Sequence, residues 1–282
     1  MDNKPEWEWE IKPDENWFKL NLREIVQYKD LLFRFVRRDI IASYQQTILG
    51  PIWVFLQPLL TTVVYFIIFR KIANIPTADA PPILFYLPGI IIWTYFSDCF
   101  TGVMNTFLYN AYIFSKVYFP RVIVPISNVF FHSFRLGIQL VLFLIVYAFF
   151  AFRMPQIRPS AYILLLPYLL ILTAGFALGA GLIISVLTAK YRDLDNILQF
   201  LLRLFMFATP VVYPVSLVPE QYRYFFWLNP LTAVIETFRA AFFSTTTIRF
   251  NYLLLSTLTV SLILLTGLIV FRKHEIKIMD VI

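Results

Sequence analysis

The sequence is poor in the residues that carry redox and metal chemistry. Among its 282 residues there is one cysteine, Cys99, and there are two histidines. A single cysteine excludes an internal disulfide and a cysteine-based metal site. The phosphate loop G-x-x-x-x-G-K-[ST], the zinc motif H-E-x-x-H and the nucleophile motif G-x-S-x-G are also absent. We therefore expect no catalytic residue, no metal site and no resident cofactor on this chain.

Charge is scarce as well. Charged residues make up 15% of the chain, whereas a soluble domain averages about 25%. Hydrophobic residues make up 59%, and the mean hydropathy is +0.71. The apolar residues fall in long runs, which indicates an all-α integral membrane protein. The net charge of +7 is then expected to set topology and to contact anionic lipid, not nucleic acid.

Six runs approach the ~20 residues that a helix needs to cross the hydrocarbon core. They are residues 52–69, 84–107, 125–150, 161–187, 196–212 and 252–271, of which the fifth is short. The N-terminus lacks the basic start and apolar core of a signal peptide, so insertion should rely on the first span.

The distribution of Lys and Arg over the loops moderately favours a cytosolic location for both termini. Arg223, Arg239 and Arg249 fall on the outer side, but they lie in one long segment, which weakens their contrary signal. The chain then reads as a 1–19 polar tail, a membrane domain over 49–275 and a 276–282 cytosolic tail.

Residues 20–48 predict an amphipathic helix that precedes the first span. Asn21 and Glu24 have the spacing of a capping box, and apolar residues recur at helical intervals opposite a row of arginines and lysines. Such a profile is typical of a helix in the plane of the membrane interface. The alternative is an ordinary helix packed on a soluble core.

The junction that follows this helix is Leu49-Gly50-Pro51, with Trp53 just inside the first span. Gly50 gives the backbone the freedom to turn from the interface into the bilayer, and Pro51 is suited to starting the next helix.

Residues 213–251 are too apolar for a solvated loop and contain two short helical patterns separated by Asn229-Pro230. Two short re-entrant helices on the outer side would explain this pattern, since irregular backbone at membrane depth must be covered by protein or line a cavity. The alternative is two amphipathic helices that lie flat on the outer surface.

Four ionisable residues fall within or near the drawn spans: Asp98, His132, Arg135 and Arg203. Such residues are costly in lipid and usually face the bundle interior, an aqueous path or the interface. We expect structural pairing, for example of Asp98 with an arginine, more readily than a proton relay. Gly175 and Gly179, four residues apart, predict close helix packing in the fourth span.

Four segments, taken in order, carry a family resemblance: RRDIIASYQQTILGPIWVFLQPLL, KVYFPRVIVPIS, AKYRDLDNILQFLLRLFMFATPVVYP and WLNPLTAVIETFR. Over about residues 20–275 the chain resembles type-2 ATP-binding-cassette export permeases. The most similar group is the polysaccharide exporters, which move O-antigen, capsular polysaccharide or teichoic acid.

The resemblance implies a homodimer of six-span subunits joined to two copies of a separate ATPase, which would hold the ATP and Mg. It implies a bacterial cytoplasmic (inner) membrane location and a glycan carried on an undecaprenyl-type lipid. Spans one and five would line the conduit across the dimer. The segment from Tyr213 to Phe243 would supply outer gate helices, and Arg192-Asp193 matches the motif that opens the fifth span.

Three groups of site residues follow from the resemblance. Residues 109–119 would hold the coupling helix that docks on the ATPase, with Tyr112, Ile113, Phe114, Lys116, Tyr118 and Phe119. Substrate access at the cytosolic mouth would involve Arg34, Arg37, Arg38, Leu49 and Gly50. The conduit and its gate would involve Trp53, Tyr65, Phe207, Tyr213, Phe226 and Trp227. The arginines suit the oxygens of a pyrophosphate, but anionic phospholipid is an equally good partner.

The function expected from these features is the transmembrane subunit of an ATP-driven exporter of lipid-linked polysaccharide. Within the family, a permease for a smaller lipid or drug is the nearest alternative. An ion-coupled transporter or flippase would need polar sites near the midplane, often in repeated halves, and no convincing repeat is present. A membrane-embedded glycosyltransferase would need acidic catalytic residues, for which Asp193 and Asp195 are thin support.

Overall fold

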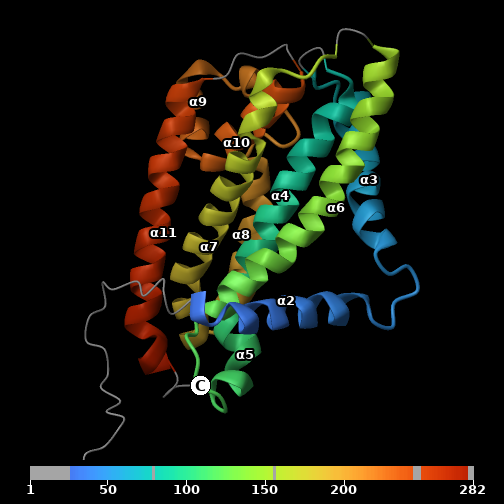
Figure 1. Ribbon diagram of the computed structural model, residues 1–282. Coiled ribbons are helices and arrows are strands. Elements are labelled where there is room, and N and C mark those ends of the chain that lie inside the picture. Colours follow the sequence, from blue (N-terminus) through green and yellow to red (C-terminus); the bar gives the residue numbers. More distant parts are fainter. Residues whose placement is uncertain (1–25, 78–79, 155–156, 244–248, 279–282) are drawn as a thin grey trace, which may run out of the picture.

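The computed structural model describes residues 26–77, 80–154, 157–243 and 249–278. That part of the chain is helical and contains no strand. Long helices stand side by side in a bundle, and helix α2 (Lys29–Tyr44) lies across one end of it (Figure 1). We call this end the α2 end, and the opposite end, where α9 and α10 lie, the α9 end. The predicted cap at Asn21 lies outside the described residues.

Within the described residues, five helices are long and apolar enough to cross a membrane: Ile52–Ile72, Pro82–Met104, Ile123–Arg153, Ala161–Lys190 and Phe250–Glu275. The first joins α3 (Ile52–Tyr65) to a π-helical stretch, Phe66–Ile72. The next three are α4, α6 and a short 3₁₀ turn, Ala161–Leu165, that continues into α7 (Leu166–Lys190). The last belongs to α11 (Phe250–Ile278). Five of the six predicted spans therefore have helices of membrane length.

The fifth predicted span is shorter than the sequence suggests. Helix α8 covers Leu194–Phe207, 14 residues, which is a length of about 21 Å against a hydrocarbon core of about 30 Å. The apolar run continues to Val212, but Pro210 lacks the N–H that a helix requires, and the chain turns there. A full crossing at this position would need the turn and the segment after it.

Helices α9 (Glu220–Leu228) and α10 (Pro230–Phe242) occupy the predicted positions on either side of Asn229. The Asn229 side chain accepts a hydrogen bond from Leu231 N (3.1 Å) and so caps α10, and Pro230 follows at the first helical position. Nearly all of α10 is buried among α4, α7 and α11, whereas α9 buries only Trp227. Helix α10 thus lies inside the bundle and not flat on its surface; its depth in a bilayer remains a prediction.

Two apolar cores hold the bundle together. The larger surrounds α4 and α10 toward the α9 end, and α4 is the most buried of the long helices. The smaller core joins α2, α5 (Thr106–Phe114), the start of α6 and the far part of α11 at the α2 end. Each end of the protein therefore has its own packing centre.

Close packing of α7 against α11 confirms the role predicted for small residues in the fourth span. A Cβ atom added at Gly179 would lie 2.6 Å from Leu264 Cα, and one added at Gly267 would lie 2.4 Å from Gly179 O. Backbones in such contact have no space for a side chain. Gly267 lies in the sixth span and was not singled out by the sequence.

Replacing Gly267 with valine is therefore expected to lower the free energy of unfolding by at least about 1–3 kcal/mol, the usual cost of overpacking. Thermal unfolding of the purified protein in nanodiscs would measure the change. The matched control is Gly137→Val, because a Cβ atom at Gly137 meets nothing within 4 Å. Equal melting temperatures for the two variants would contradict the assigned contact.

Candidate functional site

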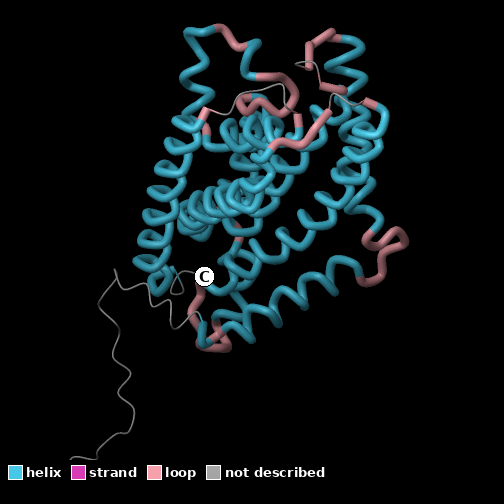
Figure 2. Tube along the Cα trace, turned by 45° about the horizontal axis from the view of Figure 1, so that its top comes forward, coloured by secondary structure: helices cyan, strands magenta, loops and turns pink. Residues whose placement is uncertain are grey.

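The α2 end presents a crosswise helix joined to the bundle by a tight turn. Figure 2 shows α2 along the base and the loop that leads from it into α3. Gly50 has φ +48°, a left-handed conformation that favours glycine. Ile48, Leu49 and Trp53 around it are exposed. The predicted turn from interface to span therefore has the backbone geometry that Gly50 was expected to supply.

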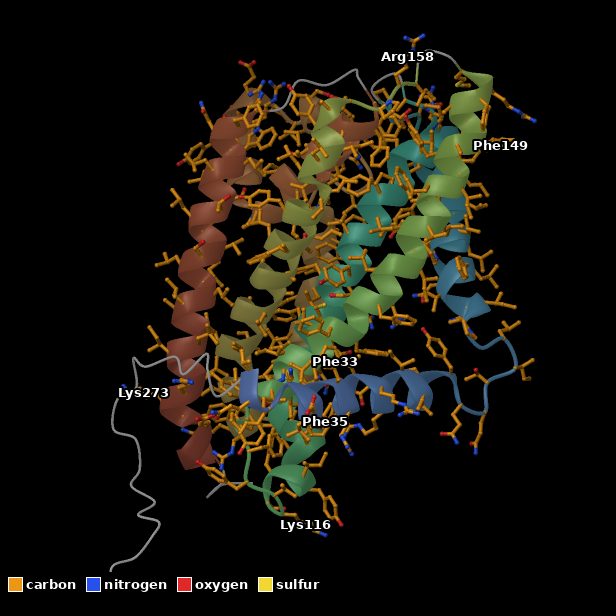
Figure 3. All side chains as sticks on the ribbon, in the orientation of Figure 1. Phe33, Phe35, Lys116, Phe149, Arg158 and Lys273 are labelled. Carbon is orange, nitrogen blue, oxygen red and sulfur yellow. The ribbon has the colours of Figure 1, made fainter. Side chains whose placement is uncertain are left out.

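Helix α2 exposes side chains on several sides. Leu32 is buried in the core of the α2 end, while Phe33 is exposed and lies on the opposite side of α2 from Phe35 (Figure 3). The predicted access residues Arg34, Arg37 and Arg38 are all exposed. Arg38 is partly engaged, since its Nη2 lies 2.8 Å from Asp39 Oδ1 and its guanidinium lies 4.9 Å from the Phe35 ring.

The predicted coupling segment divides into an exposed face and a buried face. Tyr112, Lys116 and Tyr118 are exposed, and Lys116 marks the tip beyond α5 (Figure 3). Phe114 and Phe119 are buried, and Ile113 packs partly against the same core. A partner at this tip would touch the tyrosines and the lysine, while the two phenylalanines anchor the segment from inside.

A row of aromatic rings connects this segment to two other helices. Phe119 packs against Phe114 and against Phe35 of α2, both at 5.7 Å between ring centroids. Phe114 contacts Phe107 at 5.9 Å, and Phe107 stacks on Phe271 of α11 at 5.0 Å. We call these five residues the aromatic row. It links α2, the coupling segment and α11 in one continuous contact.

A cavity with aromatic, aliphatic and polar lining residues and a volume of about 380 Å³ lies between α3, α4 and α8. We call it the polar cavity because Ser97, Thr101, Gln199 and Arg203 line it. It brings together two predicted conduit residues, Tyr65 and Phe207, with Trp93 of α4 and Arg203 of α8. The Tyr65 hydroxyl donates to Met206 Sδ at 3.3 Å. Trp53, a third predicted conduit residue, is not among the residues that line this cavity.

The predicted gate residues lie in two different parts of the structure. The Tyr213 hydroxyl donates to the Phe207 carbonyl, and its ring packs edge-on against Phe226 at 6.1 Å, so these residues continue from the end of α8. Trp227 points elsewhere: it is buried and stacks on Tyr252 of α11 at 4.3 Å. Tyr213 and Phe226 therefore lie near Phe207, and Trp227 serves the packing of α9 on α11.

Arg239 makes a dense set of polar contacts at the α9 end. Its guanidinium donates to the carbonyls of Pro210 (2.8 Å), Val211 (2.7 Å) and Phe85 (3.3 Å), and to Glu236 Oε1 (3.0 Å). It also lies 3.7 Å from the Phe85 ring centroid. We call this set of contacts the Arg239 clasp. It ties α10 to α4 and to the turn that ends α8.

A second ionic contact lies between α4 and α6. Arg135 Nη1 lies 3.4 Å from Asp98 Oδ2, and His132 Nδ1 lies 3.8 Å from the same oxygen. The pairing expected for Asp98 is thus confirmed. A pair of opposite charges inside a bundle is the usual structural solution for ionisable residues in spans.

Sequence reasoning missed several residues of these sites. Phe35, Phe107 and Phe271 of the aromatic row were not selected, and neither were Ser97, Thr101 and Gln199 of the polar cavity. The one available signal was the four-residue spacing of Trp93, Ser97 and Thr101 on α4, which places them on one helix face.

These features describe a helical protein with helices long enough to span a membrane, an exposed tip beyond α5 at one end and a cavity between α3, α4 and α8. Residues 30–243 match the ABC-2 type transporter family. The chain therefore belongs to the ABC-2 type transporter family, as its resemblance implied.

Relatives of the chain include O-antigen export permeases and a polysialic acid transport protein. The chain is 26% identical over 257 residues to the O-antigen export system permease protein RfbA of Klebsiella pneumoniae, covering 90% of this chain and 95% of the relative. It is 28% identical to the RfbA protein of Myxococcus xanthus, covering 79% and 84%. It is 25% identical to the polysialic acid transport protein KpsM of Escherichia coli, covering 84% and 91%.

Proposed function

We propose that this chain is the transmembrane subunit of an ATP-driven exporter that moves lipid-linked polysaccharide across the bacterial cytoplasmic membrane. The observation that carries the proposal is similarity along nearly the whole chain to O-antigen export permeases. Similarity to the capsule exporters extends over most of the chain as well. A permease for a smaller lipid or drug would not account for that pattern of relatives.

The proposal assigns each part of the function to an element of the fold. Two copies of an ATPase would dock on Tyr112, Lys116 and Tyr118 at the tip of the α2 end, which would face the cytosol together with both termini. The undecaprenyl-type carrier would enter between α2 and α3, near Leu49 and Gly50. The α3 and α8 helices of two copies of this chain would enclose the conduit, and α9 and α10 would lie at its outer end.

In this proposal the chain performs no catalysis. ATP and Mg would bind on the partner, and closure of the ATPase dimer would push on the coupling segment. The aromatic row would carry that displacement to α2 and to α11, because close-packed rings in contact move together. The arginines of α2 would meet the phosphate groups of the lipid-linked substrate at the mouth, since guanidinium groups pair well with phosphate oxygens.

The proposal can be tested by purifying the chain with the ATPase encoded beside it. A stoichiometric complex that hydrolyses ATP is expected, together with accumulation of lipid-linked glycan on the cytosolic face when the chain is deleted. Tyr112→Glu with Tyr118→Glu should prevent docking of the ATPase while leaving the melting temperature of the chain unchanged, since both side chains are exposed. Uphill transport by the chain reconstituted alone would refute the proposal.

A further inference from the structure

The polar cavity between α4 and α8 has two facing rows of side chains. Trp93, Ser97 and Thr101 follow one another at four-residue intervals on α4, and Gln199 and Arg203 do so on α8. Residues four apart share one face of a helix. Tyr65 of α3, with Leu202, Met206 and Phe207 of α8, completes the lining.

Beyond the cavity, toward α5, the polar side chains are paired with one another by hydrogen bonds. Asn105 Nδ2 donates to Asp195 Oδ1 at 2.9 Å, and Gln199 Nε2 donates to Asp195 Oδ2 at 3.0 Å. Both oxygens of the carboxylate are therefore engaged by amides. Asp195 lies on the same helix as Arg203 but is not its counter-ion.

Arg203 is the one charged residue among those that line the cavity. Within the described residues it has no ion pair and no hydrogen bond, and the hydroxyls of Ser97 and Thr101 beside it make no side-chain hydrogen bond either. By contrast, the groove on the other side of α8 is lined by apolar residues, among them Phe96, Phe176 and Leu201. The Arg203 side chain is exposed, so water or an anion that enters the cavity can reach its guanidinium.

We propose that this cavity is a binding site for an acidic sugar residue, in which Arg203 pairs with a carboxylate or phosphate on the saccharide. The inference rests on the proposed function and narrows its substrate class to glycans that carry such groups. The guanidinium fork matches these anions with two parallel hydrogen bonds. Ser97, Thr101 and the Gln199 carbonyl offer partners for sugar hydroxyls, and Trp93, Tyr65 and Phe207 offer ring faces for the sugar's apolar side.

The test uses the purified full chain in nanodiscs and two oligosaccharides of equal length, a hyaluronan tetrasaccharide, which carries carboxylates, and neutral chitotetraose. Binding is followed by tryptophan fluorescence, with Trp93→Phe to identify the cavity's own signal. Because hydrogen bonds to charged groups are the strong ones, Arg203→Gln is expected to weaken binding of the acidic tetrasaccharide by about ten- to a hundredfold. Binding of chitotetraose should not change.

The matched control is Arg153→Gln, which removes an arginine at the end of α6 whose described contact is the Phe149 ring at 4.2 Å. It should leave both affinities unchanged. Equal binding of the acidic tetrasaccharide by wild type and Arg203→Gln overturns the inference. So does a change in dimer mass in Arg203→Gln, since the arginine would then serve assembly.

A lipid headgroup is the other source of an anion. Nanodiscs of phosphatidylcholine and of phosphatidylglycerol separate the two: saccharide binding that depends on Arg203 in both supports the inference. An effect of Arg203→Gln that appears only with phosphatidylglycerol overturns it. None of these binding measurements needs the ATPase. Normal export by Arg203→Gln with unchanged affinity would remove the saccharide site and leave the proposed function intact.

Discussion

Replacing Arg239 with leucine is expected to destabilise the α9 end of the protein by about 3–5 kcal/mol, the cost of removing one partner from a buried ion pair. Arg239 is 2% exposed. Its removal leaves Glu236 without its cation and the carbonyls of Pro210 and Val211 without their donors. Unpaired buried acceptors each add to the cost. Unfolding of the purified protein in detergent, followed by circular dichroism, would measure the change.

The chain contains a close control for this prediction. Arg223 also pairs with a glutamate three residues earlier, Glu220 at 3.4 Å, and also donates to two carbonyls, those of Val218 and Ser216. Its side chain is 33% exposed and that of Glu220 is 89% exposed. Exposed ion pairs contribute little, so Arg223→Leu should cost less than about 1 kcal/mol. If both leucine variants unfold alike, burial is not what gives the Arg239 clasp its strength.

A lysine at position 239 separates charge from geometry. Lysine keeps the positive charge but has no planar fork, so it cannot reach Phe85 O, Pro210 O and Val211 O together. The stability of Arg239→Lys should therefore fall between the stabilities of the wild type and of Arg239→Leu. Gly89 contributes to the same contact, because an added Cβ atom would lie 2.9 Å from Val211 O. The clasp therefore depends on a glycine in α4 as well as on the arginine in α10.

The long helices could be predicted because their signal is local. A run of apolar residues of membrane length is visible in the sequence without knowledge of any neighbour, and five of the six drawn spans agree with helices of that length. The pair Asn229-Pro230 was equally informative, since capping and the missing proline N–H act on adjacent residues. The end of α8 was misjudged because hydropathy continues through Val211 and Val212 after Pro210 has ended the helix.

The contacts that define the candidate sites could not be predicted, because they join residues far apart in the sequence. Phe107 and Phe271 stack although 163 intervening residues separate them in the sequence, and neither differs locally from the chain's many other phenylalanines. Arg239 reads in the sequence as one of several outer-side arginines. Its burial depends on carbonyls supplied by α4 and by the turn after α8. Contacts of this kind produce no periodic pattern in the sequence, so only the folded structure identifies them.

Truncating Phe119 to alanine is expected to release α2 from the rest of the α2 end. Phe119 is 5% exposed and is the ring through which the aromatic row reaches Phe35 of α2. Loss of a buried phenylalanine side chain costs about 3–5 kcal/mol when the site cannot collapse. Hydrogen exchange measured by mass spectrometry should therefore become faster in α2, while exchange in α10 should not change, because α10 belongs to the other core.

Two further variants make this expectation specific to the ring contact. Phe35→Ala removes the other ring of the pair, so the double variant should cost less than the sum of the two single ones, by about 0.5–1.5 kcal/mol for an aromatic pair. Phe149→Ala removes an exposed ring of α6 far from the aromatic row and should leave exchange in α2 unchanged (Figure 3). Strict additivity of Phe35→Ala and Phe119→Ala would mean that the two rings act independently.

Phe119→Ala also distinguishes docking of the ATPase from transmission of its force in the proposed exporter. Phe119→Ala keeps the exposed Tyr112, Lys116 and Tyr118, and Phe114 still anchors the segment in the core, so the ATPase should still bind. The displacement of the coupling segment by the ATPase would no longer reach α2, because the ring that joins this segment to α2 is missing. We therefore expect a complex that hydrolyses ATP but exports glycan at least about tenfold more slowly, as follows from a coupling loss above about 1.4 kcal/mol. Export at the wild-type rate with normal ATPase binding would exclude the aromatic row as the path of transmission.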